Sequence, residues 1–343
     1  LNLKKHEIYT VLAKVTVMAT GGVGNIYHTT TNPSVATGDG VAMVHRAKGV
    51  IENMEFIQFH PTSLYNPGER PSFLITEAMR GFGGLLRLQN GKEFMQKYHP
   101  MGSLAPRDVV ARSIDHELKI SGEEFVYLDI THKDPKEVMS HFPNIYKKCL
   151  SIGIDLTKDM IPVVPAAHYC CGGIKVNLNG ESSIRRLYAL GEASSTGLHG
   201  GNRLASNSMM EAAVYADAAA RHAISVIDSI ELQRDIPAWD YEGTAVPEEM
   251  ALITQDYKEM QQIMTNYVGI VRSDVRLERA KRRLEIIFKE TEELYLKSTL
   301  SQHLCELRNM IAVGYLIIKQ AEARHESVGL HYSIDYPAKP VEI

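Results

Sequence analysis

A short β-branched segment that runs directly into glycines constrains this chain more than any other feature. Residues 14–19 read Lys-Val-Thr-Val-Met-Ala, and the glycine-rich stretch 20–24 follows without a break. This pattern predicts a buried strand that ends in a tight turn. A strand needs partner strands in a sheet, and residues 1–13 contain little that could supply one. We therefore expect further strands upstream of residue 1 that this sequence lacks.

Length and composition predict a globular protein of two or three domains. The chain has 343 residues, of which 44% are hydrophobic and 23% charged, which are ordinary values for a globular protein. Lysine and arginine number 37 against 41 acidic residues, a formal charge of −4. A nearly neutral chain offers no basic field for nucleic acid. No apolar run reaches the roughly 18 residues that a membrane span requires, so we expect none.

The cysteines predict a reducing compartment. The chain has four, and the spacing of Cys149, Cys170, Cys171 and Cys305 fits neither a metal site nor a disulfide framework. We therefore expect no bound metal and a cytoplasmic location.

Changes of pattern along the chain divide it into five parts. Residues 1–53 and 170–232 both have strand-and-glycine character. A helix opened by Gly38-Asp39-Gly40 is expected in residues 1–53, and a helix at about 208–227 is expected in residues 170–232. Residues 54–169 alternate short strands, turns and a helix at 106–119. Residues 233–249 are polar and contain two prolines, which predicts a linker. Residues 250–343 are helical.

Two apolar stripes at helical spacing predict that the C-terminal segment is a small bundle with a shared core. One stripe consists of Leu277, Ala280, Leu284, Ile287 and Phe288; the other consists of Leu304, Leu307, Ile311, Gly314, Ile318 and Ala321.

Polar side chains beside glycine or proline turns form a candidate binding set. Taken singly, each is more often a capping or salt-bridging residue. Together they suit a small dicarboxylate, because the arginine fork matches carboxylate oxygens and histidines and hydroxyls add oriented donors. The set comprises His60, Thr76, Glu77, Arg107, His168, Arg203 and Ser206. Ser206-Asn207-Ser208 also predicts an N-cap for the helix that follows, whose positive end could hold negative charge.

The order of these motifs resembles the fumarate reductase/succinate dehydrogenase flavoprotein superfamily over essentially the whole chain. The resemblance begins with Ala19-Thr20-Gly21-Gly22 and Gly38-Asp39-Gly40, and continues through His60-Pro61-Thr62 and Ala105-Pro106-Arg107-Asp108 to the stretch 199–211. The stretches 142–146, 153–157, 161–167, 196–200 and 205–208 are similar to the aspartate-oxidising branch of that superfamily.

The resemblance implies an α/β, Rossmann-like FAD-binding domain, incomplete at its N-terminus, with an inserted α+β capping domain and a C-terminal helical bundle. It implies FAD contacts at Gly21, Gly22, Asp39, Glu192, Ser208 and Met209. It further implies that His60, Thr76, Glu77, His168, Arg203 and Ser206 bind substrate, and that Arg107 is the catalytic residue that transfers a proton.

The implied activity is FAD-dependent oxidation of L-aspartate to iminoaspartate, with oxygen or fumarate as electron acceptor. This reaction is the first step of NAD biosynthesis through quinolinate, so coupling to quinolinate synthase is a possible partnership. One alternative is a flavoprotein subunit acting on succinate or fumarate, which would share the same site residues. The other is a catalytically inactive fragment, because the GxGxxG turn that cradles the FAD pyrophosphate is absent from this sequence.

Overall fold

The computed structural model describes residues 1–5, 7–246 and 250–337, which divide into two compact units. The first unit comprises Leu1–His28, Val35–Gln58 and Tyr169–Ile343; the second comprises Thr29–Ser34 and Phe59–His168. The end of the expected linker, 247–249, and the last residues, 338–343, lie outside the described residues. The five domain boundaries expected from the sequence stay predictions.

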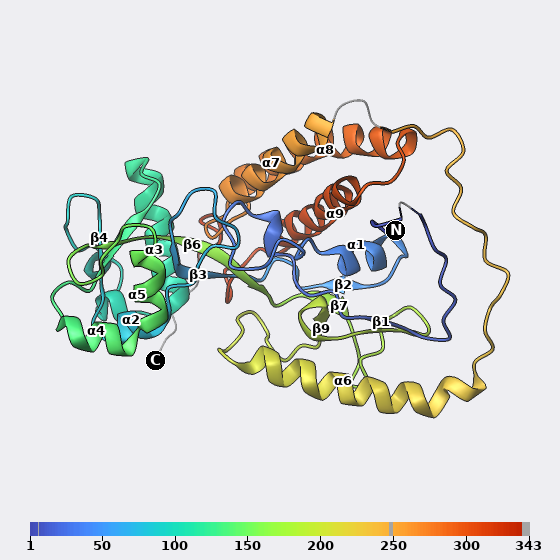
Figure 1. Ribbon diagram of the computed structural model, residues 1–343, viewed down its shortest axis with the longest axis horizontal. Helices are drawn as coiled ribbons and strands as arrows, with labels where there is room; N and C mark the ends of the chain where they lie inside the picture. The colour runs from blue at the N-terminus through green and yellow to red at the C-terminus, as the bar shows by residue number, and fades with distance from the viewer. Residues whose placement is uncertain (6, 247–249, 338–343) are drawn as a thin grey trace. The chain divides into compact units, whose positions relative to one another are not determined.

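Two small sheets lie in the first unit (Figure 1). The strand expected at 14–19 is present as β1 (Thr16–Met18), which pairs in parallel with β8 (Leu187–Ala189). Its expected burial is wrong, because Thr16 and Val17 are exposed: among the described residues β8 is the one strand that pairs with β1, so the other edge of β1 stays open. In the second sheet, β7 (Gly173–Lys175) lies between β2 (Ile51–Glu52) and β9 (Ser194–Ser195), antiparallel to β2 and parallel to β9. The partner of β1 thus comes from far along the chain.

Glycine opens the first helix of this unit, α1 (Asp39–Arg46), as the sequence predicts. Gly38 has φ +77°, and a Cβ there would lie 2.7 Å from Cγ2 of Val313. A larger residue would therefore be strained in its backbone and would collide with its neighbour.

The long helix α6 (Asn207–Val226) is also present, but the expected N-cap is wrong. Ser206 occupies the capping position with φ +70°, and its side chain makes no capping hydrogen bond. An N-cap hydroxyl bonds the amides of the first turn from an extended backbone, and Ser206 has a left-handed one instead. After a short 3-10 turn at Ile227–Ser229, the chain runs without helix or strand through residues 230–244 (Figure 1).

Three helices complete the first unit: α7 (Met250–Tyr267), α8 (Asp274–Lys297) and α9 (Gln302–Ala323). They pack on one another, and α9 also packs against α1 (Figure 1). Serine N-caps begin the last two, because Ser273 accepts from the amide of Arg276 and Ser301 accepts from that of Leu304.

The apolar stripe expected on α9 is confirmed, since all six of its residues are buried. The stripe expected on α8 is confirmed for four residues and wrong for Phe288, which is 47% exposed. Phe288 follows the buried Ile287 directly, so it lies about 100° further around the helix, at the edge of the stripe.

The second unit is built on a four-stranded sheet in the order β3-β6-β5-β4. The strands are β3 (Ile57–Leu64), β4 (Leu85–Arg87), β5 (Val126–Asp129) and β6 (Ile161–Cys170). The β4–β5 and β5–β6 pairs are antiparallel. The first two residues of β3 and the last two of β6 belong to the first unit.

Four helices accompany this sheet: α2 (Glu77–Gly81), α3 (Arg107–Ser121), α4 (Pro135–His141) and α5 (Pro143–Leu150). α3 starts directly after Pro106 and stops before Gly122, which has φ +75°. One apolar core, including Leu86, Val110, Leu128 and Ile161, joins helices and strands.

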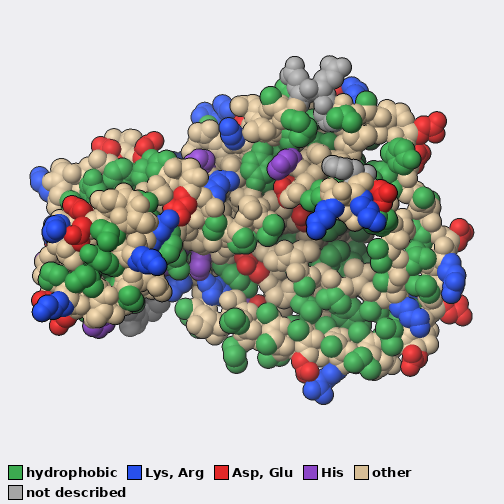
Figure 2. All heavy atoms as spheres, viewed as in Figure 1, with side chains coloured by type: hydrophobic (Ala, Val, Ile, Leu, Met, Phe, Trp, Pro, Cys, Tyr) green, Lys and Arg blue, Asp and Glu red, His purple; other side chains and the backbone are tan. Residues whose placement is uncertain are grey.

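Charge on the surface is mixed, as the nearly neutral sequence predicts. On the face of the second unit seen in Figure 2, basic and acidic side chains are interspersed. This face therefore presents no extended field of one sign. Among the described helices, none combines the length and apolarity that crossing a membrane would require.

Candidate active site

Two histidines lie close together in the second unit. His60 is on β3 and His168 is on β6, and their ring centroids are 5.6 Å apart. The hydroxyl of Thr31 lies 2.7 Å from Nδ1 of His168. Burial, helped by the nearby charges of His168 and Arg107, lowers the pKa of His60 to about 3. The His60 imidazole is therefore neutral at physiological pH.

A carboxylate holds two arginines in the same unit. Glu77 accepts a hydrogen bond from Nη2 of Arg107 at 2.6 Å through one oxygen, and from Nη2 of Arg80 at 3.0 Å through the other. Arg80 is buried, and its Nη1 also donates to the carbonyl oxygen of Ser103 at 2.9 Å. Glu77 thus fixes the Arg107 guanidinium at the start of α3.

Thr76 occupies the N-cap of α2, where its hydroxyl accepts from the amide of Ala78 at 3.4 Å. The second unit therefore contains His60, Thr76, Glu77, Arg107 and His168 of the predicted set. Arg203 and Ser206 belong to the first unit.

Gln58 and Tyr169 hold Arg203 in the first unit. Nη2 of Arg203 donates to Oε1 of Gln58 at 2.8 Å, and Nε2 of Gln58 donates back to the carbonyl oxygen of Arg203 at 2.9 Å. The guanidinium lies over the Tyr169 ring, 4.5 Å from its centroid. Arg203 is buried, and its Nε has no protein partner. Such a group is well prepared to bind an anion.

A buried polar cluster beside Arg203 has no counterpart among the predicted site residues. Nε2 of His199 lies 2.8 Å from Oε2 of Glu211 and 3.1 Å from the hydroxyl of Tyr169. Thr196 donates to the other oxygen of Glu211. The only sequence signal for this cluster is the run of family motifs between residues 196 and 211. His199 and Glu211 are 12 residues apart, and neither helical nor strand periodicity predicts that residues at this spacing are in contact.

Gly22 and Glu192, two predicted flavin contacts, are neighbours. A Cβ on Gly22 would lie 2.2 Å from Oε1 of Glu192. The same oxygen accepts from the amide of Cys170 at 2.9 Å. Burial raises the pKa of Glu192 to about 7 against the opposing effects of this hydrogen bond and of Arg203.

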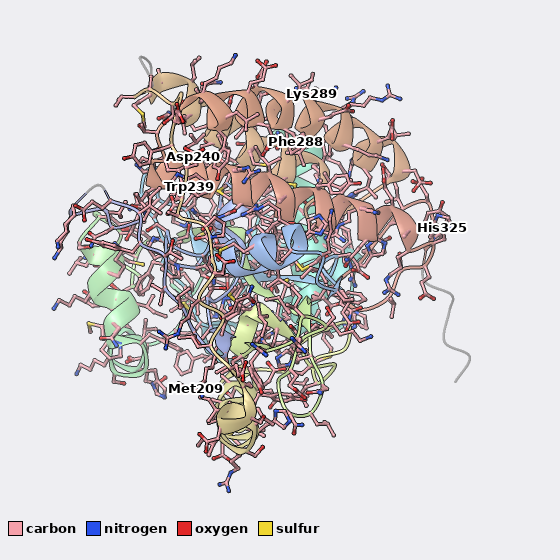
Figure 3. The ribbon with its side chains drawn as sticks, turned by 90° about the vertical axis from the view of Figure 1, so that its right-hand side faces the viewer. Met209, Trp239, Asp240, Phe288, Lys289 and His325 are labelled. Atoms are coloured by element: carbon pink, nitrogen blue, oxygen red, sulfur yellow. The ribbon has the colours of Figure 1, made fainter. Side chains whose placement is uncertain are left out.

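The remaining predicted flavin contacts lie at the starts of two helices. Asp39, the first residue of α1, accepts from the Thr37 hydroxyl at 2.9 Å and from Nδ2 of Asn309 at 2.8 Å. Ser208 lies in the first turn of α6, with its hydroxyl 3.5 Å from Nη1 of Arg203. Met209 projects from α6 and is 80% exposed (Figure 3).

The residues of the first unit fit part of a flavin nucleotide. The buried Nδ1 of His199 and Nε of Arg203 have no protein partner, so they can face a polar ligand. Gly21 has φ +75° and no atom near its would-be Cβ, which leaves backbone open to a ligand. The described residues contain no cluster of histidine, cysteine and acidic side chains suited to a metal ion.

The chain belongs to the family of proteins with an FAD binding domain, which it matches over residues 1–209. Residues 257–340 match the C-terminal domain of fumarate reductase flavoproteins. FAD is therefore the cofactor, and the fold is that of a fumarate reductase or succinate dehydrogenase flavoprotein, with an FAD-binding part and a C-terminal helical part.

Curated relatives carry the name L-aspartate oxidase. Those of Pseudomonas aeruginosa and Yersinia pestis are each 48% identical to this chain over 98% of its length. The chloroplastic L-aspartate oxidase 2-a of Nicotiana tabacum is 46% identical over 98% of the chain. The chain spans 62% of the Pseudomonas protein, 63% of the Yersinia protein and 55% of the tobacco protein.

Two solved structures show the same fold. A point mutant of the FrdA protein of E. coli quinol fumarate reductase aligns with a TM-score of 0.78 and 30% identity, covering 96% of this chain and 62% of its own. Mycobacterium smegmatis Sdh1 in complex with UQ1 aligns with a TM-score of 0.79 and 33% identity, covering 95% and 57% respectively.

Proposed function

We propose that the protein oxidises L-aspartate to iminoaspartate, with FAD as cofactor and oxygen or fumarate as electron acceptor. The observation that carries this proposal is the 48% identity to L-aspartate oxidases over nearly the whole chain. Identity to the fumarate reductase and Sdh1 structures is lower, at 30% and 33%.

In the second unit, which we assign as the capping domain, His60 and Thr76 bind a substrate carboxylate. Nδ1 of the neutral His60 imidazole lies 3.1 Å from the carbonyl oxygen of Thr62 and 3.3 Å from its amide nitrogen, so the Thr62 backbone orients the ring. With its proton on Nε2, the ring can donate a hydrogen bond to a carboxylate. His168, oriented by Thr31, adds a second imidazole donor.

Arg107 exchanges a proton with the substrate, and Glu77 positions it for this role. The Glu77 carboxylate supports this assignment because it holds the guanidinium at 2.6 Å while it is itself held by the buried Arg80. Fixing a general acid in one geometry removes the entropy cost of positioning it at each turnover.

In the first unit, Arg203 binds a substrate carboxylate and Ser206 adds a hydroxyl. Arg203 is suited to this role because Gln58 and Tyr169 hold its side chain while Nε stays without a protein partner. Gly21, Gly22, Asp39, Glu192, Ser208 and Met209 contact FAD, which supplies the two-electron acceptor when bound.

Two further assignments complete the proposal. The product imine is consumed in quinolinate formation, and quinolinate synthase is the partner that would use it. The four cysteines are all free thiols, which supports a location in the reducing cytoplasm.

Anaerobic flavin reduction tests the substrate. The purified protein is desalted, its flavin content is measured from the visible absorbance, and it is then mixed with L-aspartate or with succinate. We expect aspartate to bleach the flavin at least about 100-fold faster, because a site built for an amine is left with unpaired polar groups by succinate. Comparable rates would favour the succinate-oxidising alternative, and a chain that retains no flavin would favour the inactive fragment.

A further inference from the structure

A groove in the first unit is lined by none of the residues assigned to substrate or flavin. It is formed by the C-terminal end of α1 together with α8 and α9, and its volume is about 540 Å³. Pockets of this size are typical for small organic ligands. Nothing in the proposed reaction requires it.

The groove has an apolar floor and aromatic walls. Leu284 and Ile311, both buried, line it from α8 and α9. Phe288, on α8, also lines it (Figure 3). So does Tyr315, and the two residues are 47% and 41% exposed. Exposed aromatic faces that line a concave surface are suited to a flat apolar body.

Positive charge exceeds negative charge in the lining, which contains five lysines and arginines and only two glutamates. Three of the cations are already paired: Lys289 with Glu285 at 2.8 Å, Lys281 with Glu322 at 3.0 Å and Arg308 with Glu292 at 2.5 Å. Throughout the described chain, no carboxylate lies within 4.0 Å of the Arg46 guanidinium or the Lys48 ammonium. Neither cation therefore forms an ion pair, although the Glu292 carboxylate is near enough to act on the charge of Arg46.

Arg46 is held in place for a ligand. Its Nη2 donates to Oδ1 of Asn309 at 2.6 Å, and Asn309 is fixed at its other end by Asp39. Partial burial and the nearby Arg308 guanidinium both lower the pKa of Arg46. A bound anion would relieve that repulsion, and Arg46 keeps further N–H donors for it.

We propose that this groove binds a small aromatic carboxylate, with its ring against Phe288 and Tyr315 and its carboxylate on Arg46 and Lys48. The three paired cations leave Arg46 and Lys48 as two cationic donors, one for each oxygen of a single carboxylate. The aromatic lining selects against small inorganic anions, which gain nothing from it.

Binding of 2-naphthoate to the purified protein tests the proposal, measured by isothermal titration calorimetry. Two comparison ligands each lack one recognised group: 2-naphthalenemethanol is neutral and lacks the carboxylate, and acetate lacks the aromatic ring. We expect 2-naphthoate to bind with a Kd of about 1 mM or tighter, as the size of the ligand allows, and both comparison ligands to bind at least about tenfold more weakly.

Variants locate the site. Arg46→Gln and Phe288→Ala should each weaken 2-naphthoate binding about tenfold. Arg282→Gln is the matched control, because Arg282 is an exposed α8 cation that does not line the groove, and it should change nothing. Circular dichroism melts establish that each variant is folded, and Lys48→Gln replaces Arg46→Gln if that variant is not. Absent binding, equal binding of the neutral analogue, or binding insensitive to the groove variants would overturn the proposal.

Discussion

Replacing Glu77 by glutamine should reveal the cost of leaving Arg80 without its counter-charge. Glu77 pairs with both Arg80 and Arg107, and Arg80 is only 1% exposed. Removing one partner from a fully buried ion pair costs about 3–5 kcal/mol. The Glu77 side chain is 41% exposed, and a glutamine oxygen can still accept from Arg80. We therefore expect Glu77→Gln to lower the free energy of unfolding by about 1–2 kcal/mol.

Urea denaturation measures this loss, with Glu69→Gln as the matched control. Glu69 lies in the same unit and pairs with Lys148 at 2.5 Å, but both partners of that pair are partly exposed. Its replacement should cost less than about 1 kcal/mol. In an Arg80→Met background, Glu77→Gln should lose most of its effect, because the buried charge is gone. If Glu77→Gln costs no more than Glu69→Gln, or costs the same in both backgrounds, the reasoning is refuted.

Two further outcomes are expected. Arg107→Lys should lower turnover about 100-fold or more while leaving the urea midpoint nearly unchanged, because a lysine keeps the charge but not the donor geometry. Arg112→Lys on the same helix is the control. A loss of turnover of only a few-fold in Arg107→Lys would contradict the assignment of Arg107 as the proton-transferring residue. Glu192→Gln should gain stability over the parent as pH rises. In the parent, the Glu192 carboxyl has a pKa near 7 in the folded state against an ordinary value of 4.5. Its contribution to the free energy of unfolding is therefore greatest below pH 4.5 and is lost as pH rises through 7. The variant's advantage in free energy of unfolding should therefore be larger at pH 8.5 than at pH 5 by about 1–3 kcal/mol, and equal advantages at the two pH values would contradict the raised pKa.

Local pattern predicted the elements of the fold better than their partners. The β-branched run at 14–19 correctly predicted the strand β1 but not its exposure to solvent, and the spacing of apolar residues correctly predicted the buried stripe on α9. Neither pattern could show that β1 pairs with β8, because strand pairing depends on contacts between segments distant in sequence. The prediction that Phe288 belongs to the buried stripe on α8 was wrong. A residue at the edge of a helical face is buried only if neighbouring elements pack over it, and the helical spacing does not show which elements do.

Family motifs could name the candidate substrate-binding and catalytic residues. They could not name the side chains that hold those residues in place through hydrogen bonds and ion pairs. Glu77 was predicted to bind substrate, and its bridge between two arginines became visible only in the structure. The Ser206 N-cap was wrong because a residue type favours a cap only when its backbone is extended. His199 and Glu211 went unassigned because a buried hydrogen bond between segments leaves no periodic trace in the sequence.

The close approach of Gly22 to Glu192 makes these two positions mutationally interdependent. A methyl group at 22 would lie 2.2 Å from the Glu192 carboxylate, which could move aside only by giving up the amide hydrogen bond from Cys170. A selection from a library randomised at both positions should therefore recover alanine or serine at 22 only alongside a shorter residue at 192. A substitution at 22 should therefore be tolerated only after a shorter residue has appeared at 192.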